Sequence, residues 1–306
     1  MAAAGLRLAA LRISMLGSSG SGGRFQAPSF SQQKGLLMNR EQKLSTARKQ
    51  KMKYRAISVL SVAVFILIWY VATAVLELVP SYSLPSPVKV FSTFIAKLSS
   101  KAPDGATLGQ HFLASLQVAT YGYVLGAVIG VPLGIAMGWF DWVDKLFRPV
   151  FDFLKPIPPI ALIPVMIVIF GISIRAKAVL IFFSTVIPCI LNSYSGIRQT
   201  RQIHLWVSQT FGATNSQQLF SVAIPSAMPM IFAGLRVAMG SSWMALVAAE
   251  LLASTRGLGY LISIGRSLLR SDLIIVGILC LGMIGIVISA LFDVVERLFV
   301  RGRNEK

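Results

Sequence analysis

The chain has 306 residues, of which 55% are hydrophobic and 13% charged, and its mean hydropathy is +0.71. Soluble domains carry about 25% charged residues, so the chain has too little charge to form the surface of a soluble protein of this length. The formal net charge is +18, but outside the N-terminal segment no basic face is interleaved with aromatic residues, which argues against nucleic acid as a partner.

Six apolar segments are each about long enough to cross a bilayer, which takes roughly 20 residues in a helix. They are 57–79, 112–138, 156–174, 176–195, 228–253 and 273–295. The sequence therefore predicts an all-α polytopic membrane protein with about six transmembrane helices. If the N-terminal segment is cytoplasmic, 19 Lys and Arg residues lie on the cytoplasmic side and eight on the external side. Because cytoplasmic loops carry the excess of basic residues, both termini are expected in the cytoplasm.

Residues 1–55 form a basic segment that is not expected to fold. They hold 11 Lys or Arg residues and one acid, and 18–23 is a flexible Gly/Ser run. The composition resembles that of a transit peptide, but Met38 offers a simpler explanation as the true start. We expect a disordered cytoplasmic tail or an upstream-start artefact here, and a short basic cytoplasmic C-terminus over 297–306.

Residues 56–110 are expected to contain the first transmembrane helix and an external segment. The prolines between Pro80 and Pro87 disfavour helix. From Val88 to Leu98, apolar residues recur at helical spacing. This pattern predicts a short amphipathic helix that lies on the membrane or packs on the helix bundle.

Glycines recur every four residues along the second predicted span, which places them on one face of a helix. They are Gly122, Gly126, Gly130, Gly134 and Gly138. Helices in lipid associate through close backbone approach and dispersion rather than through the hydrophobic effect. We therefore expect a tight packing seam, either with another helix of the chain or with another copy of it.

Prolines cluster where the third span begins, at positions 149, 156, 158, 159 and 164. Broken backbone at membrane depth is tolerated only where it is buried in protein or lines a watery cavity. One hypothesis is a discontinuous entry around 155–164, with Pro158, Pro159 and Pro164 beside a translocation path. The alternative is an interfacial loop followed by an ordinary helix from about Ile160.

A polar-leaning segment, 198–225, joins the fourth and fifth spans on the predicted cytoplasmic side. Gly212 can take the positive φ that ends a helix, and Thr214 or Asn215 can cap the next one. Pro225 is expected to stop that helix before the fifth span. Two short helices separated by a turn are predicted, and they would form a docking site for a soluble partner.

This segment resembles the signature loop of the permeases of ATP-binding-cassette (ABC) importers. That loop reads Glu-Ala-Ala, three residues, Gly, nine residues, then Ile-x-Leu-Pro. Here Gly212 precedes Val222-x-Ile224-Pro225 at the same spacing. Trp206, Val207 and Ser208 replace the Glu-Ala-Ala, so the Glu that helps to bind the ATPase in the family is missing.

Further segments look like the nitrate, sulfonate, taurine and bicarbonate branch of type I permeases. They are 156–164, 234–238, 247–250 and 257–262. The resemblance covers about residues 57–296, and the permease core is expected over 111–296 with its coupling loop at 198–225.

The resemblance implies a multi-pass protein of the cell (inner) membrane that works in lipid as a homodimer. A solute-binding protein would deliver a small anion such as a sulfonate, taurine, nitrate or bicarbonate. Each copy would dock one cytoplasmic ABC ATPase. The implied docking residues are Trp206, Val207, Ser208, Thr210, Phe211, Gly212, Ala213, Thr214, Gln217, Gln218, Leu219 and Pro225.

The sequence predicts neither catalytic nor metal-ligating residues in the chain. It has no G-x-x-x-x-G-K-[ST] motif, so a partner subunit would bind the ATP and no cofactor is expected here. Two histidines and two cysteines, Cys189 and Cys280, are too few for a metal cluster or a disulfide framework. Both cysteines are expected as small core residues.

Two charged residues fall in the fifth span. Glu250 is a candidate for the gate or the solute path, because an acid at the centre of a membrane helix costs about 2.5–3.5 kcal/mol. The alternative is that water solvates it at the outer end of the span. Arg236 is expected to reach the interface by snorkelling rather than to pair with an acid of another helix.

A self-sufficient secondary transporter is the alternative function. It would need coupling acids and an internal repeat, and no convincing repeat is found. A membrane enzyme fits less well, because nothing in the sequence resembles a catalytic cluster.

Overall fold

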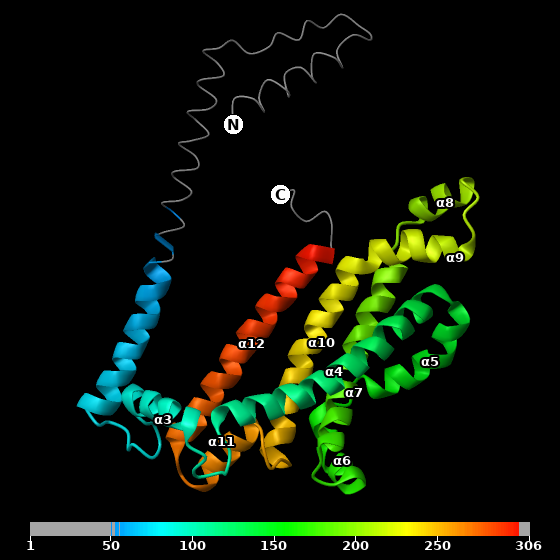
Figure 1. Cartoon of the computed structure of the whole chain (residues 1–306). Helices are drawn as coiled ribbons and strands as arrows, with labels where there is room; N and C mark the ends of the chain where they lie inside the picture. Colours follow the sequence, from blue (N-terminus) through cyan, green and yellow to red (C-terminus); the bar gives the residue numbers. More distant parts are fainter. Residues whose placement is uncertain (1–49, 51–52, 55, 300–306) are drawn as a thin grey trace, which may run out of the picture. The chain divides into compact units, whose positions relative to one another are not determined.

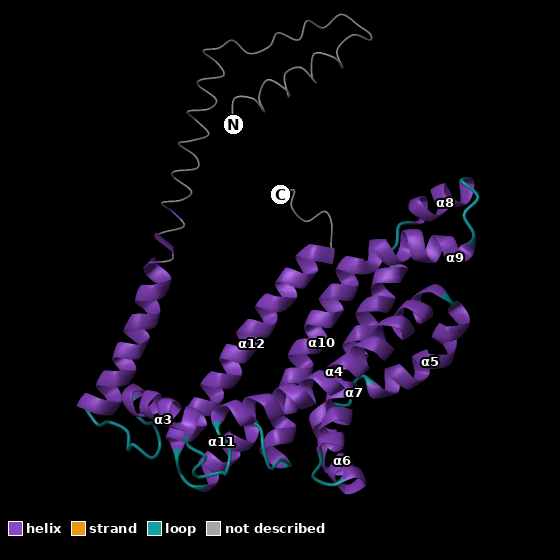
Figure 2. Cartoon of the chain, viewed as in Figure 1, coloured by secondary structure: helices purple, strands orange, loops and turns teal. Residues whose placement is uncertain are grey.

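The computed structural model describes residues 50, 53–54 and 56–299, in which every regular element is a helix (Figures 1 and 2). The predicted N-terminal tail therefore lies almost entirely outside the described residues, as do residues 300–306 of the predicted C-terminal tail. The chain divides into two units, 1–65 and 66–306. The elements below belong to the second unit.

In the second unit, two short π-helical segments and one 3-10 helix lie between the α-helices. The elements are η1 (Val71–Val75), α3 (Pro87–Ser99), α4 (Leu108–Trp139), α5 (Asp141–Leu154), η2 (Pro159–Leu162), α6 (Ile163–Phe170), α7 (Ile174–Arg198), α8 (Gln202–Thr210), α9 (Asn215–Gln218), η3 (Leu219–Ala223), α10 (Ile224–Leu252), α11 (Leu258–Ser267) and α12 (Ser271–Phe299).

Among the described residues, five helices are long and apolar enough to cross a membrane. They are Ala56–Val75, Leu108–Trp139, Ile174–Arg198, Asn215–Leu252 and Ser271–Glu296. Each corresponds to a span predicted from the sequence, although the helices extend up to 13 residues further, as at Asn215. The all-α, multi-span prediction is therefore confirmed.

The third predicted span, 156–174, is a broken element rather than a single helix. Its sequence belongs to a bent pair, Asp141–Leu154 and Pro159–Phe170, whose two parts meet at 81°. Proline causes the break, because it removes a backbone donor inside a helix but is tolerated in the first turn. Pro159 accordingly opens η2, and Pro164 lies in the first turn of α6. The discontinuous entry is confirmed, and η2 with α6 is too short to be the ordinary spanning helix of the alternative.

The five glycines of α4 pack against α7 of the same chain, one of the two partners considered above. A Cβ built on any of them would lie only 2.5–2.8 Å from an atom of α7, closer than side chains approach. At Gly130 that atom is the Cβ of Cys189, which is itself buried and free. Only glycine lets the two backbones come this close, so this packing requires glycine at all five positions.

The short amphipathic helix predicted over 88–98 is α3. Its first turn is capped by Ser86, whose Oγ accepts from the Lys89 N–H at 3.4 Å. Thr93 lies on the buried side and donates 2.8 Å to the Asp272 carboxylate of α12. The apolar stripe that includes Phe91 is exposed in the isolated chain. The Thr93 contact and the buried Val90, which packs in the core cluster with Leu258, thus hold α3 on the bundle. The exposed stripe that includes Phe91 is free for lipid.

Gly130→Leu is expected to destabilise the fold, because the new side chain collides with Cys189 and with the backbone of Val186. Overpacking of a tight core costs about 1–3 kcal/mol, and a backbone collision belongs at the upper end. Thermal unfolding in detergent should show the loss. Gly282→Leu is the matched control, since a Cβ at Gly282 meets nothing within 4 Å. Equal melting temperatures for the two variants would contradict the seam.

Candidate functional site

A helical hairpin, α8 with α9, projects beyond the ends of α7 and α10 (Figure 1). Its turn depends on Gly212, whose φ of +78° is costly for residues with a side chain. Thr214 then caps α9: its Oγ1 accepts from the Gln217 N–H at 3.4 Å, and its own N–H donates 2.8 Å to Gln217 Oε1. This reciprocal capping box fixes the direction in which the chain leaves the turn.

Pro225 does not end the second helix of the hairpin, so that prediction is wrong. The backbone stays helical from Asn215 to Leu252. A π-helical turn, η3, lies before Pro225, and the proline falls in the first turn of α10. Proline is compatible with that position because its missing N–H needs no partner in a first turn.

The hairpin exposes large aromatic side chains and carries no acid, Lys or Arg between Gln202 and Ala223. Phe211 at the turn is 86% exposed and Trp206 on α8 is 60% exposed. Exposed apolar groups outside the membrane helices mark interaction surfaces. The hairpin therefore offers an uncharged, aromatic surface to a partner.

An open hollow of about 520 Å³ lies between the hairpin and the start of α10. Its lining residues are His204, Val207, Ser208, Ser221, Val222, Pro225 and Ser226. Three predicted docking residues, Val207, Ser208 and Pro225, thus meet at one concave surface. Two others, Gln218 and Leu219, are buried, and Gln218 Nε2 donates 3.1 Å to the Ala213 carbonyl. Those two hold the hairpin together instead of facing a partner.

A cluster of charged residues next to the root of the hairpin was not found from the sequence. The ring of Tyr194, near the end of α7, has the guanidinium groups of Arg148 and Arg198 at 5.3 and 5.7 Å. Each arginine also pairs at 2.6 Å with an acid in the first turn of α5, Asp144 and Asp141 respectively. In the sequence, only the spacing of four residues between Asp144 and Arg148 indicates an ion pair of this cluster. The cluster ties α5 to the end of α7, where the chain turns into α8.

At the other end of the unit, Glu250 is only 1% exposed and caps the start of α11. Its carboxylate accepts from Ser115 Oγ at 2.7 Å and from the Gly259 N–H at 2.9 Å. Ser115 Oγ in turn accepts from the Leu258 N–H at 2.9 Å. A carboxylate is favourable at a helix N-terminus, where the first N–H groups lack helical partners. The geometry therefore gives Glu250 a packing role, and its place in a gate or solute path stays a prediction.

The same buried polar network continues from α4 to the loop before it. His111 Nδ1 accepts from the Gly257 N–H at 3.1 Å, and its Nε2 contacts the Asp104 carboxylate. Asp104 also pairs with Lys97 of α3, and both side chains are almost fully buried. Hydrogen bonds thus connect α3, α4, α10 and α11 at this end.

The family model of the binding-protein-dependent transport system inner membrane component matches residues 130–305. The chain belongs to this family. It is 32% identical over 233 residues to the taurine transport system permease protein TauC of Escherichia coli, covering 76% of this chain and 84% of TauC. It is 31% identical over 245 residues to the nitrate import permease protein NrtB of Synechocystis, covering 78% and 87%. It is thus a type I ABC importer permease of the nitrate, sulfonate and taurine branch, and a multi-pass protein of the cell membrane.

A solved structure shares the fold of this permease. The match is a chain of the MetNI methionine ABC transporter in an inward-facing conformation, with a TM-score of 0.57 and 18% identity. The alignment covers 63% of this chain and 96% of the MetNI chain. Permease subunits of this family are not themselves enzymes, and they associate with an ATPase and a solute-binding protein.

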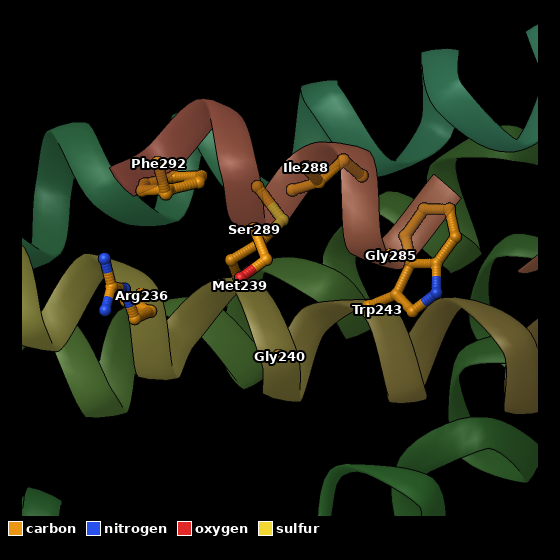
Figure 3. A pocket seen from close by; sticks show the side chains of 8 residues that line it. All are labelled: Arg236, Met239, Gly240, Trp243, Gly285, Ile288, Ser289 and Phe292. Atoms are coloured by element: carbon orange, nitrogen blue, oxygen red, sulfur yellow. The ribbon is translucent and has the colours of Figure 1, made fainter. Parts of the chain in front are cut away.

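Arg236 of the permease does not snorkel, contrary to the sequence-based expectation. It pairs with Asp293 and, at 2.7 Å, with Glu296, both on α12. A hollow of about 150 Å³ lies beside it between α10 and α12, with Trp243 at its far end (Figure 3). Because two carboxylates compensate the guanidinium, this hollow offers no net positive charge to an anion.

The three prolines proposed to lie beside the translocation path are located at the break between α5 and α6. Pro158 immediately precedes η2, Pro159 opens it and Pro164 lies in the first turn of α6. Pro158 and Pro164 are exposed and Pro159 is half-buried in the isolated chain. Their position is compatible with contact to solute or to a second copy, and their role stays a prediction.

Glu250→Gln is expected to lower the stability of the permease by about 1–3 kcal/mol. Only one side-chain oxygen would remain to accept from Ser115 Oγ and the Gly259 N–H, because the amide nitrogen cannot accept. Thermal unfolding in detergent checks this. Asp152→Asn is the matched control, since Asp152 is exposed and has no ion pair in the described part of the chain. An unchanged melting temperature combined with lost transport would instead place Glu250 in the gate or the solute path.

Proposed function

We propose that this permease forms the membrane pathway of an importer for a small anion of the taurine, sulfonate, nitrate or bicarbonate kind. A solute-binding protein would deliver the anion, and a separate cytoplasmic ATPase would bind the ATP, so that this chain needs no cofactor. Two copies in the membrane would form the pathway, with Pro158, Pro159, Pro164 and Glu250 as the candidate residues along it. The names of TauC and NrtB support the anion class.

The observation that carries the proposal is the projecting α8–α9 hairpin. It lies between two membrane helices, α7 and α10, so that a force on the hairpin acts directly on both. It is rigidly built, with a glycine turn and a capping box. ATP-driven rearrangement of a docked ATPase would therefore be transmitted to the helices without an intervening flexible linker.

The docking contact is expected to be apolar rather than ionic. Trp206 occupies the position of the family's Glu, and the hairpin carries no acid, Lys or Arg. Exposed aromatic side chains are typical anchors at the centre of protein interfaces. We propose that Trp206 and Phe211 insert into the ATPase surface, and that the hollow beside Pro225 receives a side chain from it.

Phe211→Asp is expected to reduce recovery of the ATPase with the affinity-tagged permease by at least roughly tenfold, because a buried, unpaired carboxylate costs more than the 1.4 kcal/mol that tenfold represents. Co-purification from native membranes in mild detergent measures this. Tyr82→Asp is the matched control, since Tyr82 is an exposed aromatic residue in the turn before α3, at the opposite end. Equal recovery with both variants would remove the hairpin from the docking surface.

Reconstitution tests the transport function. Proteoliposomes that contain the permease and its co-purified ATPase are supplied with purified taurine-, sulfonate- and nitrate-binding proteins of the source organism, each with its labelled anion. Uptake is expected with one of these pairs, and only when ATP is present on the ATPase side. Uptake by the permease alone without ATP would establish a secondary transporter instead.

A further inference from the structure

The two ends of the unit differ in the balance of their cations and acids. Near the hairpin and α5, Arg148, Arg198 and Arg236 pair with carboxylates. Lys145, Lys155 and Arg201 there are exposed and have no ion pair among the described residues, but the acids on this side nearly match the cations in number. At the opposite end, around α3 and α11, exposed Lys and Arg side chains have no ion pair among the described residues. They are Lys89, Lys101, Arg175, Arg256 and Arg266. We refer to these five residues as the basic face.

The acids at this end are not available to neutralise the basic face. Asp104 is held by Lys97 and His111, and Glu250 caps α11. Asp272 pairs with Arg270 at 2.7 Å. Among the described residues of this end, Glu77 is the remaining acid, and it is a single exposed charge. The basic face therefore retains an excess of positive charge.

Two cations of the basic face lie on loops that are fixed by hydrogen bonds from buried lysines. Buried Lys97 donates 3.0 and 2.7 Å hydrogen bonds to two carbonyl oxygens of the loop that carries Lys101. Buried Lys177 donates 2.9 Å to Ser254 in the loop that carries Arg256. Buried lysines thus hold the backbone while the exposed ones remain free. Such preorganisation reduces the ordering cost of binding.

We propose that the basic face docks an acidic surface of the solute-binding protein, an inference that rests on the proposed function. Lys and Arg on the external side oppose the charge bias that orients the chain, so their presence here calls for a reason of another kind. The five cations come from the starts and ends of helices and from two loops, and none lines either hollow described above. A broad distribution fits a macromolecular surface better than a single small anion. Complementary charge accelerates encounter and selects the partner.

The test uses the permease–ATPase complex in zwitterionic nanodiscs and the binding protein that supports uptake in the reconstitution. It measures how fast the two associate. Biolayer interferometry at low and high salt gives the rate constants. For the unmodified chain, the association rate is expected to fall at least roughly tenfold from low to high salt, because screening weakens steering. The double variant Lys101→Glu/Arg256→Glu should lose at least roughly tenfold at low salt and most of its salt dependence.

The control variant Lys145→Glu/Lys155→Glu reverses two exposed charges outside the basic face. It should associate like the unmodified chain, and ATPase activity without binding protein should be equal in all three. An association rate that neither salt nor the double variant changes would overturn the basic face as the docking surface. So would unchanged association with a raised KM for the anion, which would show that the cations act on the solute. If no binding protein supports uptake, the proposed function itself fails.

Discussion

The contact between α4 and α7 is the constraint on which the rest of the permease depends. Lipid provides no hydrophobic force between helices, so the pair is held by dispersion between closely spaced backbones. An adjacent side of α7 packs equally closely against α10, where a Cβ on Gly234 would lie 2.5 Å from the Cβ of Asn192. Because α7 is held by two helices, the hairpin that follows it and the polar network between α4 and α10 have defined positions.

Features that depend on local sequence were predictable. Hydropathy located the spans, the four-residue repeat located the glycine face, and Gly212 with Thr214 located the turn and the cap of the hairpin. Pro225 was misread because proline marks the first turn of a helix as readily as its end. The sequence contains no signal for the π-helical turn that makes the first-turn position available.

Features that depend on distant contacts were not predictable. Arg236 was expected to snorkel because it lies near the inner end of the fifth span, yet it pairs with Asp293 and Glu296, which are 57 and 60 residues away. Glu250 was correctly singled out as unusual, but Ser115, its partner, is 135 residues away. Period and hydropathy identify which face of a helix is buried; they do not identify which helix covers it.

The chemistry of the two ends fits two kinds of partner. A subunit that stays bound through a transport cycle gains most from desolvated aromatic contacts, whose strength depends little on salt, and the hairpin offers such contacts. A soluble protein that must arrive, release its solute and leave gains from long-range attraction, which raises the association rate more than the final affinity. The unpaired cations at one end therefore suit a partner that exchanges rapidly. The uncharged aromatic hairpin at the other end suits a partner that stays attached.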